Sequence, residues 1–359
     1  MGKTYSYNEL TSLTAAILTK IYGYTAEEAA ITATVLVEAD ARGIPSHGVS
    51  RLDFYMTNLK GGFTKPGAMP EAVYQTPCSL VVDGHAGVGP YITAWAVEKM
   101  IDKARAAGSG FCAVRNSNHY GIAGYWAEQC AAAGMVGMAF TNTRACGIPT
   151  FGSERILGTN PIAVAIPESD VHGDGAGVFL LDIATTTVAH GKVEVYDRRK
   201  KPMPEGWAVD ENGQGTTDAS AFEKLFYANP RFGGHLFLGG EGEELGGHKG
   251  YGLGLLVELL CSGLSLGVSS QLTFQKGGGS GTTHFFACFR LDLFGPAPEI
   301  RAHIHEILQT VRDSRKAAGH ERIYIHGEKE AEARKHALEH GIALDEATCA
   351  LLEGLKEQL

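Results

Sequence analysis

The spacing of hydrophobic positions predicts that the first sixty residues are mainly helical. Apolar residues recur at helical intervals, and Ser6-x-x-Glu9 and Thr25-x-x-Glu28 have the pattern of capping boxes. The second of these helices is expected to stop at Gly43, and another follows Ser50 and ends at Gly61. Residues 43–48 therefore form a loop between two helices, too short to be a linker.

From about residue 79 the pattern changes to short β-branched and aromatic runs separated by glycine, which is typical of strands. Helices are expected among them at about 90–107, 121–133 and 250–266. The run of charge, glycine and proline at 192–218 predicts a long ordered excursion, because Trp207 and Val209 require burial. The expected strands are Ser79–Val82, Phe111–Arg115, Val136–Asn142, Ile162–Ile166, Val178–Ile183 and His284–Leu291.

After about residue 295 the pattern is helical again, interrupted by one short expected strand at Arg322–Ile325. Helical ends around a β-rich middle predict a mixed α/β fold of the α+β type. We expect a discontinuous helical domain, residues 1–78 and 295–359, packed on a central domain of residues 79–294. The length of 359 residues agrees, since single cores usually stop growing at roughly 250 to 300 residues.

Composition and charge exclude several classes of partner. The net charge of −9 argues against nucleic acid, which is bound by clustered Lys and Arg. The basic run Arg198–Lys201 is either a phosphate patch or a solvated turn. No apolar run approaches the roughly 20 residues that a membrane span needs, and the polar start of the chain lacks a signal peptide. We therefore expect a cytoplasmic protein with no membrane partner.

Metal and nucleotide motifs are missing from the sequence. The seven cysteines are widely spaced and include no Cys-x-x-Cys, which favours reduced thiols over disulfides or a zinc cluster. His336 and His340 are four residues apart, but the residues between them lack the zincin glutamate, so we expect a solvated helix face and no metal site. Neither Gly-x-Gly-x-x-Gly nor a P-loop is present, which counts against a Rossmann dinucleotide site.

Two histidines are candidates for proton transfer. His119 lies in the segment Arg115–Tyr125, where an apolar strand gives way to a helix, and His47 lies in the loop at 43–48. An imidazole with an ordinary pKa of about 6.5 can exchange a proton near neutral pH. The small polar neighbours Ser46, Ser117 and Asn118 favour this role, although a structural role for each histidine stays open.

Arg51 and Tyr55 follow His47 at intervals of four residues, so both can face its loop from one side of a helix. A guanidinium is suited to clamp a carboxylate because it is permanently charged and bidentate. The alternative is a surface arginine stacked on Tyr55.

Other segments offer polar groups at the ends of elements. Asn160 is at a turn where its amide could meet a substrate, and Asp182 ends a buried strand where it could hold ribose hydroxyls or orient a histidine. His248 and Lys249 precede an apolar helix, whose N-terminal amides could bind an anion; Lys249 could also lie in solvent. Taken alone, His326–Glu328 would be a turn.

Seven segments, in order, resemble the malate/L-lactate dehydrogenase family that is unrelated to the Rossmann-type enzymes of the same names. The likeness runs from about Tyr7 to Leu355 and is specific because the order is kept. The segments are Ser46-His47-Gly48 with Arg51 and Tyr55, Asn116–Gly121, Thr141-Asn142-Thr143, Leu157–Pro161, Asp182–Thr185 with Gly191-Lys192, His248–Gly252, and His284-Phe285-Phe286.

The resemblance implies a homodimer whose central domain binds NAD or NADP on a largely antiparallel sheet. It implies hydride transfer between the nicotinamide and C2 of a small 2-hydroxy or 2-oxo acid, with malate favoured over lactate. By resemblance His119 and His47 are the acid/base candidates, and Ser46, Arg51, Tyr55 and Asn160 surround the substrate. The implied cofactor contacts are Thr143, Asp182, Ile183, Ala184, His248, Lys249, His326, Gly327 and Glu328.

Alternatives remain at this stage. Relatives that reduce the cyclic imine piperideine-2-carboxylate, or that oxidise ureidoglycolate or sulfolactate, share the same motifs. A protein of this fold that binds anions without catalysis is a further alternative, opposed by the presence of both histidines, Arg51 and Lys249.

Two positions depart from the family pattern. His326 replaces the proline that usually precedes Gly-Glu, and Arg144 follows Thr143 where a small residue is common. Arg144 could meet a second anionic group, such as the distal carboxylate of malate. It could equally pair with a neighbouring acidic side chain.

Overall fold

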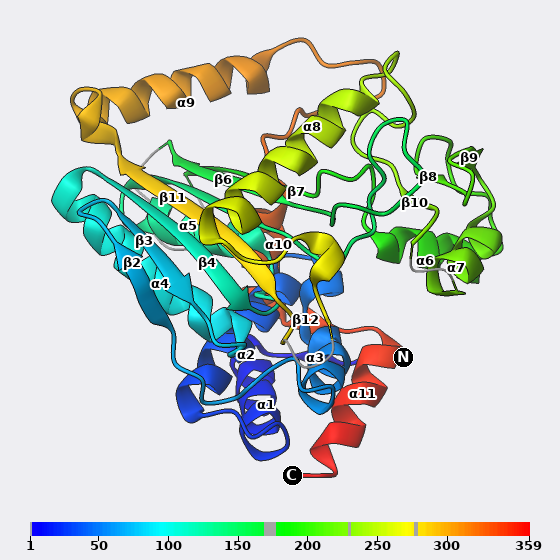
Figure 1. Cartoon of the computed structure of the whole chain (residues 1–359). Helices are drawn as coiled ribbons and strands as arrows, with labels where there is room; N and C mark the ends of the chain where they lie inside the picture. The colour runs from blue at the N-terminus through cyan, green and yellow to red at the C-terminus, as the bar shows by residue number, and fades with distance from the viewer. Residues whose placement is uncertain (1, 169–176, 229–230, 276–278) are drawn as a thin grey trace.

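A seven-stranded sheet forms the centre of the computed structural model, which describes residues 2–168, 177–228, 231–275 and 279–359 (Figure 1). Its strand order is β2-β3-β4-β11-β5-β6-β7. Only the β3–β4 pair is parallel within this sheet, which confirms the largely antiparallel sheet and the mixed α/β class. The bounds are β2 Glu71–Gln75, β3 Ser79–Asp83, β4 Ser109–Ser117, β5 Met135–Thr141, β6 Ile162–Pro167, β7 Val178–Ile183 and β11 Thr282–Arg290.

Helices cover both faces of this sheet. α4 (Gly89–Ala107) packs on β4, and α5 (Ala123–Ala132) packs on β5 and β6. α8 (Gly247–Glu258), continued by a π-helical turn, contacts β5 and β11 and crosses in front of the sheet in Figure 1. With both faces covered, β5 is buried at nearly every position, which explains its continuous apolar sequence.

The two ends of the chain meet below the sheet. β1 (Thr4–Tyr5) pairs with β12 (Ile342–Ala343), and the buried side chains of five helices share one hydrophobic cluster with the sheet. α9 (Ala297–Asp313) stands apart at the top of Figure 1 and has no buried residue. The division into 1–78 with 295–359 and 79–294 remains a prediction. The five helices are α1 Tyr7–Lys20, α2 Ala26–Ala41, α3 Leu52–Lys60, α10 Glu328–His340 and α11 Glu346–Lys356.

A smaller unit projects to the right in Figure 1 and has its own hydrophobic cluster, centred on Val193 and Phe222. We call the described part of residues 188–235 the α6–α7 unit. The segment 192–218, which we expected to be an ordered excursion, is ordered. Its first residues belong to the helix α6, which begins at His190. Its elements are α6 His190–Arg198, β8 Ala208–Val209, β9 Gly215–Thr216, α7 Ala219–Ala228 and β10 Gly234–His235.

The expected strand at Arg322–Ile325 is wrong, because these residues have irregular structure. The backbone N–H of Ile325 donates to the Glu328 carboxylate at 3.1 Å instead of a neighbouring strand. The edge strand β2 was not expected, and its side chains are mostly exposed. Thr25 forms a complete capping box, whereas Ser6 caps only the N–H of Glu9.

None of the described helices is both long and apolar enough to cross a membrane.

Candidate active site

The loop that carries His119 is fixed from several sides. It joins β4 to α5, and the side-chain amide of Asn118 donates to the carbonyl oxygens of Phe63, Ala86 and Gly87 at 2.8–3.1 Å. Gly89, at the start of α4, lies against the carbonyls of Asn118 and His119, and a Cβ at this position would overlap both. The imidazole therefore projects from a rigid support.

His47 and His119 lie together although 72 positions separate them in the sequence. Their rings stack with centroids 5.5 Å apart and planes 27° apart. Two 3₁₀ turns, Pro45–His47 and Val49–Arg51, present His47, and the Asp40 carboxylate holds them by accepting from the N–H of Val49 at 2.7 Å. The structure thus brings together the two histidines that the sequence analysis singled out.

Hydrogen bonds assign the tautomer of His119. Its Nδ1 lies 2.9 Å from the hydroxyl of Tyr55 and accepts from the backbone N–H of Gly121 at 3.4 Å. Burial raises the pKa of Tyr55, so this hydroxyl keeps its proton and acts as a donor. With two donors at Nδ1, the ring proton of neutral His119 is on Nε2.

Both imidazoles are neutral at physiological pH. Burial, followed by the charge of Arg51, lowers the pKa of His47 to about 4. Burial, followed by His47 and Arg51, holds the pKa of His119 well below its ordinary value. Desolvation disfavours the imidazolium, and the nearby cation adds to this effect.

Arg51 supplies a cation beside the histidine pair. Its Nε donates to the carbonyl of Ser46 at 2.5 Å, and its guanidinium carbon lies 5.9 Å from the centroid of Phe54. The expected alternative of stacking on Tyr55 is not what the structure has. Within the described residues Arg51 has no acidic partner, so its positive charge is available to an anion. The hydroxyl of Ser46 lies 3.0 Å from Nδ1 of His47.

Asn160 is held by a carboxylate that the sequence analysis missed. Its amide nitrogen donates to the Glu258 carboxylate and to the carbonyl of Gly254, both at 2.9 Å. The Oδ1 of Asn160 is buried without a hydrogen-bond partner among the described residues, as a ligand-binding group would be. Glu258 also accepts from Ser270 and Ser262. The available signal was an acid inside the apolar run of residues 255–260.

Asp182 lies at the end of β7, facing the start of α5. Its Oδ2 accepts from the N–H of Gly124 at 2.7 Å. The residue as a whole is exposed, but burial of its carboxylate raises the pKa to about 6 against the effect of that hydrogen bond. Ile183 and Ala184 follow it and are half-buried. The loop that carries His119 is thus joined to the end of β7.

Hydrogen bonds link Thr143, through Thr159, to Thr185, which follows Asp182 closely in the chain. Its hydroxyl accepts from the N–H of Thr159 at 3.0 Å, and the carbonyl of Thr159 accepts from the N–H of Thr185 at 2.9 Å. His248 and Lys249 lie in the first turn of α8, and both are exposed. An exposed lysine at a helix N-terminus fits an anion such as a phosphate.

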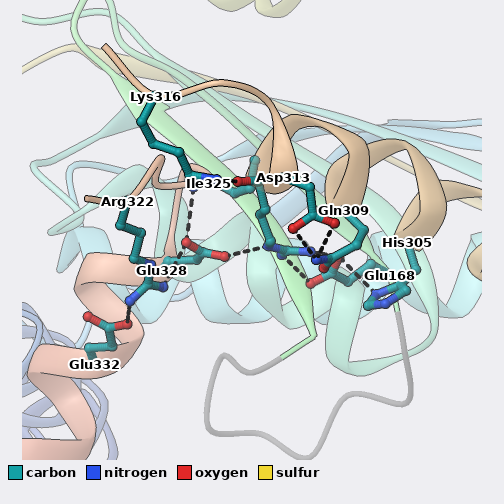
Figure 2. Close-up of polar contacts among 10 residues, drawn as sticks. Glu168, His305, Gln309, Asp313, Lys316, Arg322, Ile325, Glu328 and Glu332 are labelled. Carbon is teal, nitrogen blue, oxygen red and sulfur yellow. Dashed lines mark hydrogen bonds and ion pairs between the residues drawn. The ribbon is translucent and has the colours of Figure 1, made fainter. Parts of the chain in front are cut away.

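The segment His326–Glu328 borders a cavity beside β7. The carbonyl of His326 accepts from the N–H of Leu180 at 3.0 Å. Figure 2 shows Glu328 engaged on both sides: one oxygen accepts from Arg312 at 2.7 Å and the other from Arg322 at 2.9 Å. Burial alone would raise the pKa of Glu328, but these hydrogen bonds hold it below its usual value. The cavity has a volume of about 200 Å³, counted for the centres of water molecules. Gly327 and Glu328 form part of its lining.

Arg144 lies exposed, with its guanidinium carbon 4.8 Å from the centroid of Phe274. Phe274 in turn contacts Phe54, at 6.4 Å between centroids, and Phe54 contacts His119 at 5.9 Å. Within the described residues no carboxylate pairs with Arg144. The alternative of an acidic partner therefore finds no support there.

A sequence profile of malate/L-lactate dehydrogenase matches residues 5–353. The chain belongs to the malate/L-lactate dehydrogenase family. It is 42% identical to malate dehydrogenase of Pyrococcus abyssi over 323 residues, which cover 90% of this chain and 85% of that one. It is 36% identical over 329 residues to L-sulfolactate dehydrogenase of Methanocaldococcus jannaschii, covering 91% and 89%. The crystal structure of malate dehydrogenase from Entamoeba histolytica superposes with a TM-score of 0.92 at 32% identity, covering 100% and 98%.

Membership of the malate/L-lactate dehydrogenase family makes the chain a 2-hydroxyacid dehydrogenase, whose reaction uses a nicotinamide cofactor. The residues fit such a cofactor, because Asp182 is an exposed residue whose carboxylate can accept from hydroxyl donors, and Lys249 is an exposed cation at a helix N-terminus. Asn160 adds an orphaned acceptor. In this family member the missing glycine motif is consistent with a sheet that is not of the Rossmann type.

Proposed function

We propose that this chain is a malate dehydrogenase in which His119 exchanges the proton at the C2 oxygen and Arg51 binds the C1 carboxylate. One observation carries the proposal: a tautomer-fixed imidazole lies beside a second imidazole and an arginine that lacks an acidic partner among the described residues. The named malate dehydrogenase relatives, at 42% identity, favour malate as the substrate.

The residues around His119 suit both directions of the reaction. The bound nicotinamide supplies or accepts the hydride at C2. In reduction of the 2-oxo acid, the N–H at Nε2 of His119 donates to the C2 oxygen and passes its proton there. In oxidation the proton steps run in reverse, from the tautomer that carries the ring proton on Nδ1: the bare Nε2 receives the proton of the C2 hydroxyl, Nδ1 returns its proton to the Tyr55 oxygen, and Tyr55 passes its own proton to water. General acid/base catalysis of this kind contributes roughly 10² to 10⁴-fold.

Tyr55 keeps the imidazole neutral during the transfer. As the Nε2 proton leaves, the hydroxyl proton of Tyr55 moves to Nδ1 across 2.9 Å, and Tyr55 regains a proton from water. Tyr55 and His119 line a small cavity whose volume, counted for the centre of a water molecule, is about 10 Å³. This is close to the volume that one water molecule needs. Its polar lining includes Asn58, Thr64 and Asn118 besides Tyr55 and His119.

Substrate binding also tunes the base. The carboxylate of malate would neutralise the positive charge of Arg51. This charge is one of the causes of the low pKa of His47 and of His119. The pKa of both imidazoles should then rise toward the operating pH, where a general base is most effective. His47 remains the second acid/base candidate, with Ser46 beside it.

A substrate panel tests the proposal. Purified protein is assayed by nicotinamide absorbance with malate, lactate, sulfolactate, ureidoglycolate and piperideine-2-carboxylate, each with NAD and NADP forms. The highest kcat/KM is expected for malate and its 2-oxo acid. A higher kcat/KM for the cyclic imine would overturn the assignment, and absence of turnover with every compound would favour an anion-binding protein.

We propose NAD as the preferred cofactor, with the adenosine end beside Gly327. Three carboxylates, those of Glu168, Glu328 and Glu332, line the cavity there, and they exceed by one the two guanidinium groups that pair with them, Arg312 and Arg322. Carboxylates bind a ribose diol and repel a 2′-phosphate. The KM for NADP should therefore exceed that for NAD, and the reverse ratio would contradict the proposal.

We further propose a homodimer formed through α8 and its π-helical extension. Leu253, Leu256 and Leu259 recur every three residues and are 39–58% exposed, and Leu264 and Leu266 extend the strip. A second copy would cover it. Leu256→Glu should convert the dimer to a monomer in analytical ultracentrifugation, while an unchanged mass would contradict this interface.

We place the enzyme in the cytoplasm, since all seven cysteines are free thiols.

A further inference from the structure

A cluster of possible metal ligands lies outside the dehydrogenase site, between the two helices of the α6–α7 unit. His190 and Glu194 are four residues apart on α6, and Glu223 and Tyr227 are four residues apart on α7. Residues at this interval share one helix face, so two pairs of side chains point at each other across the helix interface. The donor atoms of His190, Glu194 and Glu223 all lie within 4.8 Å of one another.

The separations suit metal ligands better than hydrogen bonds. Nε2 of His190 is 3.6 Å from a carboxylate oxygen of Glu223 and 3.9 Å from one of Glu194. Hydrogen bonds between such groups are about 2.7–3.2 Å long. Ligands on a tetrahedral zinc ion with bonds of about 2.0–2.1 Å are roughly 3.3 Å apart. Side-chain movements of about 1 Å would therefore complete the site.

The imidazole is already oriented for this task. Its Nδ1 lies 3.0 Å from Nε2 of His235, which is fully buried, and its ring stacks on Phe226 with centroids 4.1 Å apart. Metal-binding histidines commonly bond a second group through the other ring nitrogen, which fixes the ring. Nε2 is thereby directed at the carboxylates and at the Tyr227 hydroxyl, 3.3 Å away.

Among the described residues no Lys or Arg forms an ion pair with Glu194 or Glu223, although the charges of Arg155 and Arg198 act on the cluster from a greater distance. Glu223 is 9% exposed, and its Oε1 has no hydrogen-bond partner among the described residues. The guanidinium of Arg155 lies near, but its N–H groups donate to backbone carbonyls, including those of Phe226 and Gly233. A buried carboxylate without a partner is costly unless a proton or a cation compensates it.

We propose that His190, Glu194 and Glu223 bind a divalent transition-metal ion of the zinc type, with the Tyr227 hydroxyl or water as the fourth ligand. The ion would tie α6 to α7 and stabilise a unit whose own hydrophobic cluster is small. It takes no part in hydride transfer. The sequence led us to expect no metal site, because spacing along single segments does not bring together ligands from two helices.

Metal binding by the whole protein tests this proposal. After EDTA dialysis, wild-type chain is titrated with Co²⁺, followed by its visible d–d absorption, and with Zn²⁺, followed by thermal unfolding. About one ion per chain is expected, with a rise in Tm. Glu223→Gln and His190→Ala should each weaken binding at least about 10-fold, and turnover of malate should change little.

His336→Ala with His340→Ala is the matched control, because this exposed pair lies four residues apart on one helix, with ring centroids 4.5 Å apart, and thus also has a spacing that can bind metal. The control should keep the affinity of wild type. Loss of binding in the control alone, or equal binding by all variants, would overturn the proposal. Should a variant fail to fold, X-ray absorption of the Zn²⁺-loaded wild type decides: one imidazole and carboxylate oxygens support the site, and sulfur ligands refute it.

Discussion

Apart from the exposed pair on α10, two pairs of adjacent histidines in the described part of the chain have surroundings of opposite charge. His47 and His119 have ring centroids 5.5 Å apart, and His190 and His235 have centroids 5.2 Å apart. The first pair lies beside Arg51, whereas His190 faces Glu194 and Glu223. The sign of the neighbouring charge, rather than the imidazole itself, decides which ligand such a pair suits: an anionic substrate at the first and a cation at the second.

Burial acts alike on both pairs. It is the largest cause of the low pKa of His47, about 4, and of His235, about 3. Both pairs are therefore neutral at physiological pH, and neutral imidazole has a lone pair for a proton or a metal. The comparison separates two effects: burial keeps the rings uncharged, and the local charge selects the partner.

The largest expected contrast between the pairs is in turnover. His119→Ala should lower kcat for malate by roughly 10² to 10⁴-fold, because the proton donor and acceptor at C2 is lost. His190→Ala should leave kcat near wild type. Steady-state assays at saturating cofactor measure both, with cofactor binding followed by fluorescence. Equal losses in the two variants would break the comparison.

Removing the cation from the first pair should mainly weaken substrate binding. Arg51→Gln is expected to lower kcat/KM for malate about 10 to 100-fold, chiefly through KM, since a charged hydrogen bond contributes roughly 1.5–3 kcal/mol. Arg105→Gln is the matched control, because Arg105 pairs with Asp102 on the exposed side of α4. A fall in kcat with unchanged KM would contradict a carboxylate clamp.

The pH profile sharpens the contrast with an ordinary histidine. Because the pKa of His47 is lowered to about 4 and burial holds that of His119 well below its ordinary value, the base stays unprotonated as pH falls through 6.5. The kcat/KM for malate oxidation should stay level from about pH 8 to 5 and decline only near 4. In Arg51→Gln the decline should start at higher pH, since one cause of the depression is gone. A wild-type inflection near 6.5 would refute the assignment.

The smallest expected effect concerns Arg144, the exposed cation at the edge of the first pair's aromatic neighbours. Arg144→Met should raise KM for malate by roughly 2 to 5-fold, as for other exposed charge pairs, and leave KM for lactate unchanged. Parallel Michaelis–Menten curves for the two acids measure this difference. An equal rise for both substrates would exclude contact with the distal carboxylate.

The local parts of the fold were predictable from the sequence. Apolar runs between glycines gave six of the sheet strands to within a few residues, and the Thr25 capping box marked the start of α2. The segment 322–325 has the same residue types as a strand. It pairs with no strand among the described residues, and the Glu328 carboxylate accepts from the N–H of Ile325. Pairing depends on what lies across from a segment, which its own residues do not encode.

The site shows the same limit. His119, His47 and Arg51 were predictable because each stands in a polar loop at the start of a helix. Glu258 was not, since its partners Asn160 and Ser270 come from distant segments. The α6–α7 cluster likewise arises only when two helices pack. The order of the seven segments, kept over almost the whole chain, indicated the family. The spacing of residues within any single segment did not.

Gly89 offers a way to judge other sequences that contain the same histidines. Any side chain there would displace the carbonyls of Asn118 and His119, while the rest of α4 and its buried face would be untouched. We therefore expect that a related protein with a larger residue at this position could retain every polar residue of the site and still lose activity. The residue at position 89 should be inspected together with the reactive side chains when the activity of a related sequence is judged.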